Sequence, residues 1–148
     1  MVTIRRGEAR DVAAVQAIAT RAFGGHVAAI GRRPAPMEAD YAVLVALGEV
    51  LVVGSPRIEG LAVRRFDGGR VLVEIVAVEP DAAGQGLGRA LVARCEDEGR
   101  QRGCTVAALY TNAKMEANLR IWPRLGYVEV ARRVEDGFDR VFYEKRLE

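Results

Sequence analysis

Hydrophobic residues recur along the chain either at the spacing of a helix or in short runs typical of strands. The order of these segments predicts the secondary structure. Residues 9–23 carry apolar side chains on one stripe at helical spacing, and Leu87, Leu91 and Cys95 recur at every fourth position. Short runs rich in valine, isoleucine and leucine, bounded by glycine or proline, predict strands. The predicted helices are residues 9–23, 38–47, 87–102 and 115–125. The predicted strands are residues 2–5, 50–53, 61–66, 71–78, 105–110, 128–134 and 141–145.

Turn-forming residues indicate how these elements connect. Asp67-Gly68-Gly69 predicts a reversal that makes residues 50–78 an antiparallel meander, and Asp136-Gly137 predicts a last hairpin. Residues 24–37 contain three glycines and two prolines, which favours a structured loop. Pro123 should kink or end the last helix, because it has no backbone N–H.

The composition narrows the class of protein. With 148 residues, half of them hydrophobic, residues 1–148 fit a single domain. The formal charge is only +2 and basic runs are no longer than two residues, so we expect no nucleic-acid partner. No segment approaches the roughly 18–20 apolar residues of a membrane span, and the N-terminus is too polar for a signal peptide. We therefore expect a cytoplasmic protein that does not bind membranes.

Cysteine and histidine, the usual ligands of zinc, are sparse, with two cysteines and one histidine. Cys95 and Cys104 lack the spacing of a zinc site, and the single histidine, His26, has no second ligand nearby in the sequence. No metal site is predicted, and the alternative for His26 is the lining of a substrate pocket.

A glycine-rich loop, Ala-Gly-Gln-Gly-Leu-Gly at residues 83–88, lies between a predicted strand and a predicted helix. Alternate glycines let a ligand approach the backbone, and the start of the helix directs free N–H groups and partial positive charge toward it. This pattern favours phosphate, and a connection that needs glycine only for turning is the alternative. A dinucleotide-binding fingerprint would need glycine where Arg89 stands, and a P-loop would need Gly-Lys followed by serine or threonine. Neither nucleotide motif fits.

Two stretches resemble characteristic segments of the GNAT superfamily of N-acetyltransferases. Residues 76–91, from Val-Ala-Val-Glu-Pro through the glycine loop to Arg-Ala-Leu, are similar to motif A of that family. Residues 117–127, ending Arg-Leu-Gly-Tyr, resemble its other characteristic stretch. The resemblance implies an α/β (α+β) acyl-CoA N-acyltransferase fold with a mixed central sheet of about 6–7 strands and about four helices. It also implies that the sheet splays between the strand ending at Val78 and the strand ending near Tyr110, with acetyl-CoA in the gap.

The resemblance also assigns residues to acetyl-CoA. The glycine-loop backbone would hold the diphosphate, and the backbone of Val76 and Val78 would pair with the pantetheine arm and the acetyl carbonyl. The full set is Val76, Ala77, Val78, Ala83, Gly84, Gln85, Gly86, Leu87, Gly88, Arg89, Asn112 and Asn118. The chain departs from the family pattern at two positions. Ala83 replaces the usual arginine or glutamine, and Trp122 stands where many members have a tyrosine that protonates the departing thiolate.

Acetyl transfer to an amine requires the neutral amine, whereas an alkylamine has a pKa near 10.4 and is mostly protonated at neutral pH. Alternation along the strand before the loop places Glu74 on one face with Val76 and Val78, so Glu74 is the predicted general base. A purely structural pairing of Glu74 with Arg64 or Arg65 across the sheet is an equally weighted alternative.

The leaving thiolate needs a proton, which an indole N–H does not supply near pH 7. Tyr110 is the preferred candidate for the acid and Tyr127 is the other phenol. A core position for Tyr110 is the alternative, and a thiol with a pKa near 8.5 can also depart unaided. Glu79, in the turn, is a weaker candidate for the base. Backbone N–H groups near Val76 would stabilise the oxyanion.

The predicted function is transfer of the acetyl group of acetyl-CoA to a primary amine of a small molecule or peptide in a ternary complex. The resemblance implies that residues 24–41, with Phe23, His26, Met37 and Tyr41 in or beside them, cover the acceptor. An acetyl-CoA sensor without catalysis is the alternative, because of Ala83 and Trp122. A homodimer is compatible with a fold of this kind.

Overall fold

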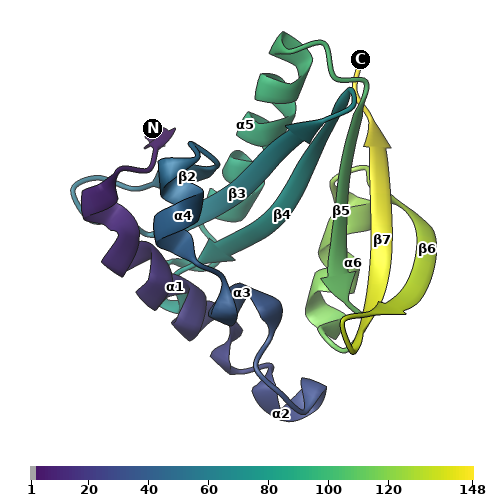
Figure 1. Ribbon diagram of the computed structural model, residues 1–148, viewed down its shortest axis with the longest axis horizontal. Helices are drawn as coiled ribbons and strands as arrows, with labels where there is room; N and C mark the ends of the chain where they lie inside the picture. The colour runs from purple at the N-terminus through teal and green to yellow at the C-terminus, as the bar shows by residue number, and fades with distance from the viewer. Residues whose placement is uncertain (1–2) are drawn as a thin grey trace.

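The computed structural model describes residues 3–148, and these residues form one mixed seven-stranded sheet in the order β1-β2-β3-β4-β5-β7-β6 (Figure 1). The strands are β1 (Ile4–Arg6), β2 (Val50–Val53), β3 (Gly60–Asp67), β4 (Arg70–Val78), β5 (Val106–Asn112), β6 (Val128–Glu135) and β7 (Phe138–Arg146). Neighbouring strands are antiparallel except β4 and β5, which are parallel. The predicted strands are confirmed, although the expected start at Val2 lies outside the described residues.

The helices are more numerous than predicted. Within residues 3–148 they are α1 (Val12–Gly24), α2 (Val27–Ile30), α3 (Ala35–Glu38), α4 (Tyr41–Ala46), α5 (Leu87–Gln101) and α6 (Glu116–Arg124), with 3-10 turns at Ala9–Asp11 and Pro80–Ala82. The expected loop at residues 24–37 contains α2 and α3. Pro34 and Pro36 start α3 because the pyrrolidine ring holds φ near the helical value. Gly31 ends α2 with a φ of 88°, and Pro123 is followed by the last residue of α6, as predicted.

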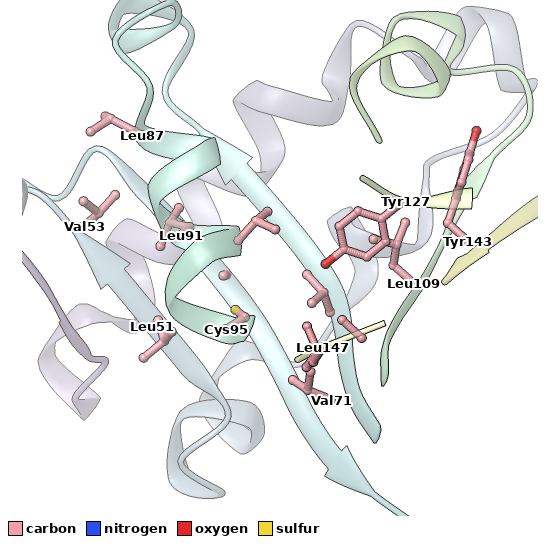
Figure 2. Packing of buried hydrophobic residues seen from close by; sticks show 14 of the residues in the cluster. Leu51, Val53, Val71, Leu87, Leu91, Cys95, Leu109, Tyr127, Tyr143 and Leu147 are labelled. Atoms are coloured by element: carbon pink, nitrogen blue, oxygen red, sulfur yellow. The ribbon is translucent and has the colours of Figure 1, made fainter. Parts of the chain in front are cut away.

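Two hydrophobic clusters lie on the two faces of the sheet. On one face, Leu91 and Cys95 of α5 belong to the same buried cluster as strand residues such as Val71 and Leu109, and Figure 2 shows part of this cluster. On the other face, α1 and α4 pack against β2 and β3, with Tyr41 at the centre of that cluster. Both faces of the N-terminal half of the sheet are therefore covered, which explains its continuous apolar strands.

Strands β4 and β5 separate soon after they pair. Their register covers only Arg70–Leu72 of β4 with Val106–Ala108 of β5, and beyond these residues the strands diverge (Figure 1). Residues 73–78 of β4 still pair with β3, but within the described residues their other edge has no strand partner. The predicted splay of the sheet is thus confirmed.

A bulge interrupts β4 at Glu74. Val63 of β3 pairs with Ile75 and Arg64 pairs with Val73, so Glu74 is an extra residue between them. Arg64 points toward α5, where its Nε donates to Glu98.

The bulge reverses the alternation of β4. Val73 before the bulge and Val76 and Val78 after it belong to the cluster under α5. Glu74 lies on the opposite face of the sheet, where it pairs with Arg65. The prediction that Glu74 shares a face with Val76 and Val78 is therefore wrong.

Gly99 tests how closely α5 packs on the sheet. A Cβ added there would lie 2.8 Å from Cγ1 and 3.1 Å from Cβ of Val71, a stiff β-branched residue. We expect Gly99→Ala to lower the free energy of unfolding by about 1–3 kcal/mol in urea titrations, because the gain in helix propensity is smaller than the cost of overpacking.

Gly88→Ala, in the same helix, is the control. Its added Cβ would have its nearest neighbour at 3.7 Å, an ordinary contact, so we expect unchanged or higher stability. Equal effects of the two substitutions would contradict this account of the helix–sheet contact.

Candidate functional site

Two cavities meet beside the gap between β4 and β5. The first, here called the loop cavity, has a volume of ≈ 420 Å³ and lies between the end of β4, the glycine loop, the start of α5 and α6. The second, here called the hairpin cavity, has a volume of ≈ 360 Å³ and lies between α3–α4, β4, β5 and the start of β7. Both are lined by Phe23, Val76, Asn118 and Trp122. A ligand can therefore extend from one cavity into the other past these four side chains.

The glycine loop presents a row of free backbone donors. Gly84 and Gly86 have φ of 84° and 81°, and a Cβ added to either would meet no atom within 4 Å. Within the described residues, the amides of residues 84–89 have no acceptor, and the first helical bond at this end runs from Ala90 N to Gly86 O. Free amides at the start of a 15-residue helix form an anion site, because the helix dipole adds to their partial positive charge.

Two arginines add full charges to this anion site. Arg89, which the family resemblance indicated, and Arg124, which it did not, both line the loop cavity. Arg124 is in the last turn of α6, where a basic residue is favoured by the helix dipole alone, so its position in the sequence did not indicate ligand binding. Gln85 is exposed beside the loop and lines neither cavity.

An ion pair holds the end of β4 next to the loop. Arg21 of α1 donates two hydrogen bonds, of 2.7 and 2.6 Å, to the carboxylate of Glu79. These hydrogen bonds hold the pKa of Glu79 below its ordinary value. Glu79 is buried and lines neither cavity, so it anchors the turn and is not placed to act as a base.

The two residues predicted to be catalytic both line the hairpin cavity. Oε1 of Glu74 is 2.9 Å from Nε of Arg65, so the alternative pairing exists, and Glu74 still contributes to the cavity wall. Tyr110 is 36% exposed, which excludes the core position considered above. The Arg140 guanidinium carbon lies 4.3 Å from the centre of the Tyr110 ring.

The other phenol, Tyr127, is not available to either cavity. Its hydroxyl donates a 2.7 Å hydrogen bond to Glu96, which also accepts a 3.0 Å bond from Lys145. Burial, with the bond to Glu96, raises the pKa of Tyr127. This group links α5 to β7 and supports the fold.

Polar side chains at the end of β5 and on α6 lie where the cavities join. Asn112 lines the hairpin cavity, and its Oδ1 accepts a 2.9 Å bond from the Lys114 amide in the turn before α6. Asn118 lines both cavities. Thr111 Oγ1 and Trp122 Nε1 are buried without a hydrogen-bond partner among the described residues, and Trp122 also lines both cavities.

The structure brings together most of the predicted acetyl-CoA residues. Those that line the loop cavity are Val76, Ala77, Val78, Ala83, Gly84, Gly86, Leu87, Gly88, Arg89 and Asn118. Of the residues expected to cover the acceptor, Met37 and Tyr41 are buried in the core and His26 lines the loop cavity. Other residues of the expected range 24–41, such as Pro34 and Pro36, line the hairpin cavity together with Leu44 of α4.

A sequence model of the acetyltransferase (GNAT) family matches residues 36–127. The chain belongs to the GNAT family of acetyltransferases. The matched range contains the glycine loop, the splayed strands β4 and β5, and α6, whereas Phe138 and Arg140 of β7, which line the hairpin cavity, lie outside it.

Individual relatives agree with this membership of the GNAT family. The L-amino acid N-acyltransferase MnaT of Escherichia coli K12 is 37% identical over 100 residues, which are 67% of this chain but only 57% of MnaT. The structure of yncA from Salmonella typhimurium, with its cofactor acetyl-CoA, is similar to this chain with a TM-score of 0.75 and 29% sequence identity. The alignment covers all of this chain and 95% of the yncA chain. The PaiA N-acetyltransferase of Thermoplasma acidophilum, in complex with coenzyme A, shares the fold, with a TM-score of 0.82 at 14% identity over 99% of both chains.

No helix among the described residues is long and apolar enough to span a membrane. No group of three or more histidine, cysteine, aspartate or glutamate side chains in this part of the chain could hold a metal ion.

The Arg21–Glu79 pair predicts a pH dependence of stability. Because the folded-state pKa of Glu79 is lowered, the pair stabilises the fold above the ordinary value of 4.5, and this contribution is lost as the pH falls through the lower folded value. We expect Arg21→Met to be less stable than the wild type in urea titrations at pH 7, with a difference that shrinks at pH 3.

The exposed pair of Arg10 with Glu8 provides the control, since both of its side chains are more than half exposed. Arg10→Met should change stability little at either pH. A deficit of Arg21→Met that is as large at pH 3 as at pH 7 would show that the ion pair is not its cause.

Proposed function

We propose that this chain transfers the acetyl group of acetyl-CoA to a primary amine by direct attack in a ternary complex. The observation that carries the proposal is the row of free amides at residues 84–89, at the mouth of a gap between two diverging strands, in a member of the GNAT family. The coenzyme A in the PaiA structure, the acetyl-CoA in the yncA structure and the similarity to the N-acyltransferase MnaT support it.

The cofactor would use both cavities. Its diphosphate matches the free amides of the glycine loop together with Arg89 and Arg124. The extended pantetheine arm matches the unpaired edge of β4 near Val76 and Val78. The amide groups of the arm can hydrogen-bond to this edge as a neighbouring strand would. The thioester would then lie where the cavities join, beside Trp122 and Asn118.

The chemistry requires a neutral amine, and Glu74 is the proposed general base, directly or through water. The amine nitrogen attacks the thioester carbonyl carbon, and the oxyanion of the tetrahedral intermediate accepts hydrogen bonds from backbone N–H groups near Val76. The carbon–sulfur bond then breaks and the thiolate leaves. Tyr110 is the proposed proton donor to the thiolate, because the indole of Trp122 cannot supply a proton near neutral pH.

Direct attack is favoured over an acetyl-cysteine intermediate by the state of the two thiols. Cys95 is fully buried, and burial raises the pKa of its thiol to about 12. Neither Cys95 nor Cys104 lines the loop or the hairpin cavity. The proposal places the enzyme in the cytoplasm, where free cysteines remain reduced.

Gly86→Glu tests the cofactor site. The new carboxylate would repel the diphosphate and obstruct approach to the amides, so we expect the dissociation constant for acetyl-CoA, measured by calorimetry, to rise by at least about 10-fold. Gly103→Glu is the control, at the other end of α5, with a similar φ of 78° and no atom within 4 Å of its added Cβ. Equal affinities of these two variants for acetyl-CoA would remove the diphosphate from this loop.

Glu74→Gln tests the base. We expect turnover at neutral pH, followed by thiol release, to fall by about 10²-fold, and the rate to keep rising toward the pKa of the free amine because only neutral amine then reacts. Arg65→Met removes the ion-pair partner and should keep most of the activity. If the two variants behave alike, the Glu74–Arg65 pair matters only structurally.

The same thiol-release assay separates transfer from the sensor alternative. Release that depends on an added amine supports the enzyme. Acetyl-CoA binding without release, across a panel of amino acids, alkylamines and peptides, would identify a sensor.

A further inference from the structure

Arg140 is a buried cation in the wall of the hairpin cavity. Among the described residues that line this cavity it is the only lysine or arginine, and its side chain is 9% exposed. Strand β7 places it opposite Asn112 of β5, and its guanidinium lies 4.3 Å from the Tyr110 ring centre and 5.5 Å from that of Phe138. Both rings are within the range of a cation–π interaction with the guanidinium.

The hydrogen-bonding capacity of Arg140 is only partly used. Its Nη1 lies 3.3 Å from a Glu135 oxygen and 3.5 Å from an Asp136 oxygen, which are long contacts to carboxylates exposed to solvent. Among the described residues, its Nε and Nη2 have no acceptor, although a guanidinium carries five N–H donors. A planar fork with two free donors at the edge of a cavity is the arrangement that binds a carboxylate at two points.

The rest of the hairpin cavity favours a small molecule with an apolar part and an amine. Pro34, Pro36, Leu44 and Phe138 contribute apolar surface. Glu74 provides a carboxylate on the β4 wall, and the other acid, Asp40, is engaged at the start of α4, where its side chain accepts a bond from the Val43 amide. An amine near Glu74 and a carboxylate near Arg140 would complement these charges.

We infer that the acceptor is a free amino acid with an apolar side chain, and that Arg140 determines this specificity by binding its carboxylate. The inference rests on the proposed acetyl transfer and narrows it, because a peptide N-terminus or a simple alkylamine has no carboxylate beside the reacting nitrogen. Loss of the ligand carboxylate would leave the Arg140 donors desolvated and unpaired, which is why discrimination should be strong.

The test compares L-leucine with L-leucinamide as acceptors at saturating acetyl-CoA, using thiol release to obtain kcat/KM. We expect the wild type to prefer L-leucine by at least about 10-fold. Arg140→Met, which keeps an unbranched apolar side chain, should lower kcat/KM for L-leucine by about 10²-fold and change that for L-leucinamide by less than about 3-fold. The change in the ratio between variants cancels the different reactivities of the two amines.

Arg133→Met is the matched control. Arg133 also pairs with Glu135, at 2.8 Å, and also stacks on an aromatic ring, that of Phe142, but it lines neither the loop cavity nor the hairpin cavity. It should keep the preference of the wild type for L-leucine. Unchanged acetyl-CoA affinity of Arg140→Met in calorimetry would show that this variant is folded. If Arg140→Met does not fold, Arg140→Lys, which keeps the charge but lacks the planar fork of donors, is used in its place.

Equal use of L-leucine and L-leucinamide by the wild type, or an unchanged preference in Arg140→Met, would overturn the inference. If no acceptor gives thiol release, the transfer proposal fails and binding still tests Arg140. In that case N-acetyl-L-leucine should bind the coenzyme A complex more tightly than N-acetyl-L-leucinamide, and Arg140→Met should abolish the difference. Equal binding of the two acetylated ligands to the wild type would reject the role of Arg140 independently of catalysis.

Discussion

Strands β4 and β5 share hydrogen bonds only at Arg70–Leu72 and Val106–Ala108, and the site depends on their separation beyond this point. A sheet edge in the interior of a protein is normally filled by another strand, because buried amide groups need partners. Here the edge of β4 opens onto two connected cavities. The glycine loop follows soon after β4 in the sequence. The unpaired edge of β4 therefore ends close to the free amides at the start of α5.

The separation persists because each half of the sheet is held independently. Strand β5 pairs with β7 along its whole length, from Val106 to Asn112, so β7 holds it in place where β4 diverges. The halves are joined under α5, where Val71, Ala107 and Leu147 belong to one buried cluster. The ion pair of Glu79 with Arg21 of α1 and that of Glu96 with Lys145 of β7 link elements on the two sides of the gap.

Much of this architecture could be predicted from the sequence because its signals are local. The meander turns, the period of α5 and the glycine loop each depend on neighbouring residues, and the family resemblance supplied the splay. The bulge at Glu74 could not be predicted, because it arises from the pairing of β3 with β4 and leaves no mark in the alternation of β4 alone. The helices α2 and α3 were missed because glycine and proline also occur at helix ends, and turns of four residues have no period to detect.

The site was predicted unevenly for the same reason. The continuous motif indicated the residues from Gly84 to Arg89, of which all but Gln85 line the loop cavity, whereas no motif indicated Arg124 or Arg140. Arg140 comes near Tyr110 only through the β5–β7 register, and one arginine in a strand full of charged residues gives no signal in the sequence.

Binding of the cofactor diphosphate by the free amides at the start of α5 can be followed by titrating ¹⁵N-labelled protein with acetyl-CoA and recording the amide chemical shifts. We expect the largest shift changes at residues 84–89, with further changes along Val76–Val78. Saturable binding of acetyl-CoA that leaves the amides of residues 84–89 unchanged would show that the diphosphate binds elsewhere.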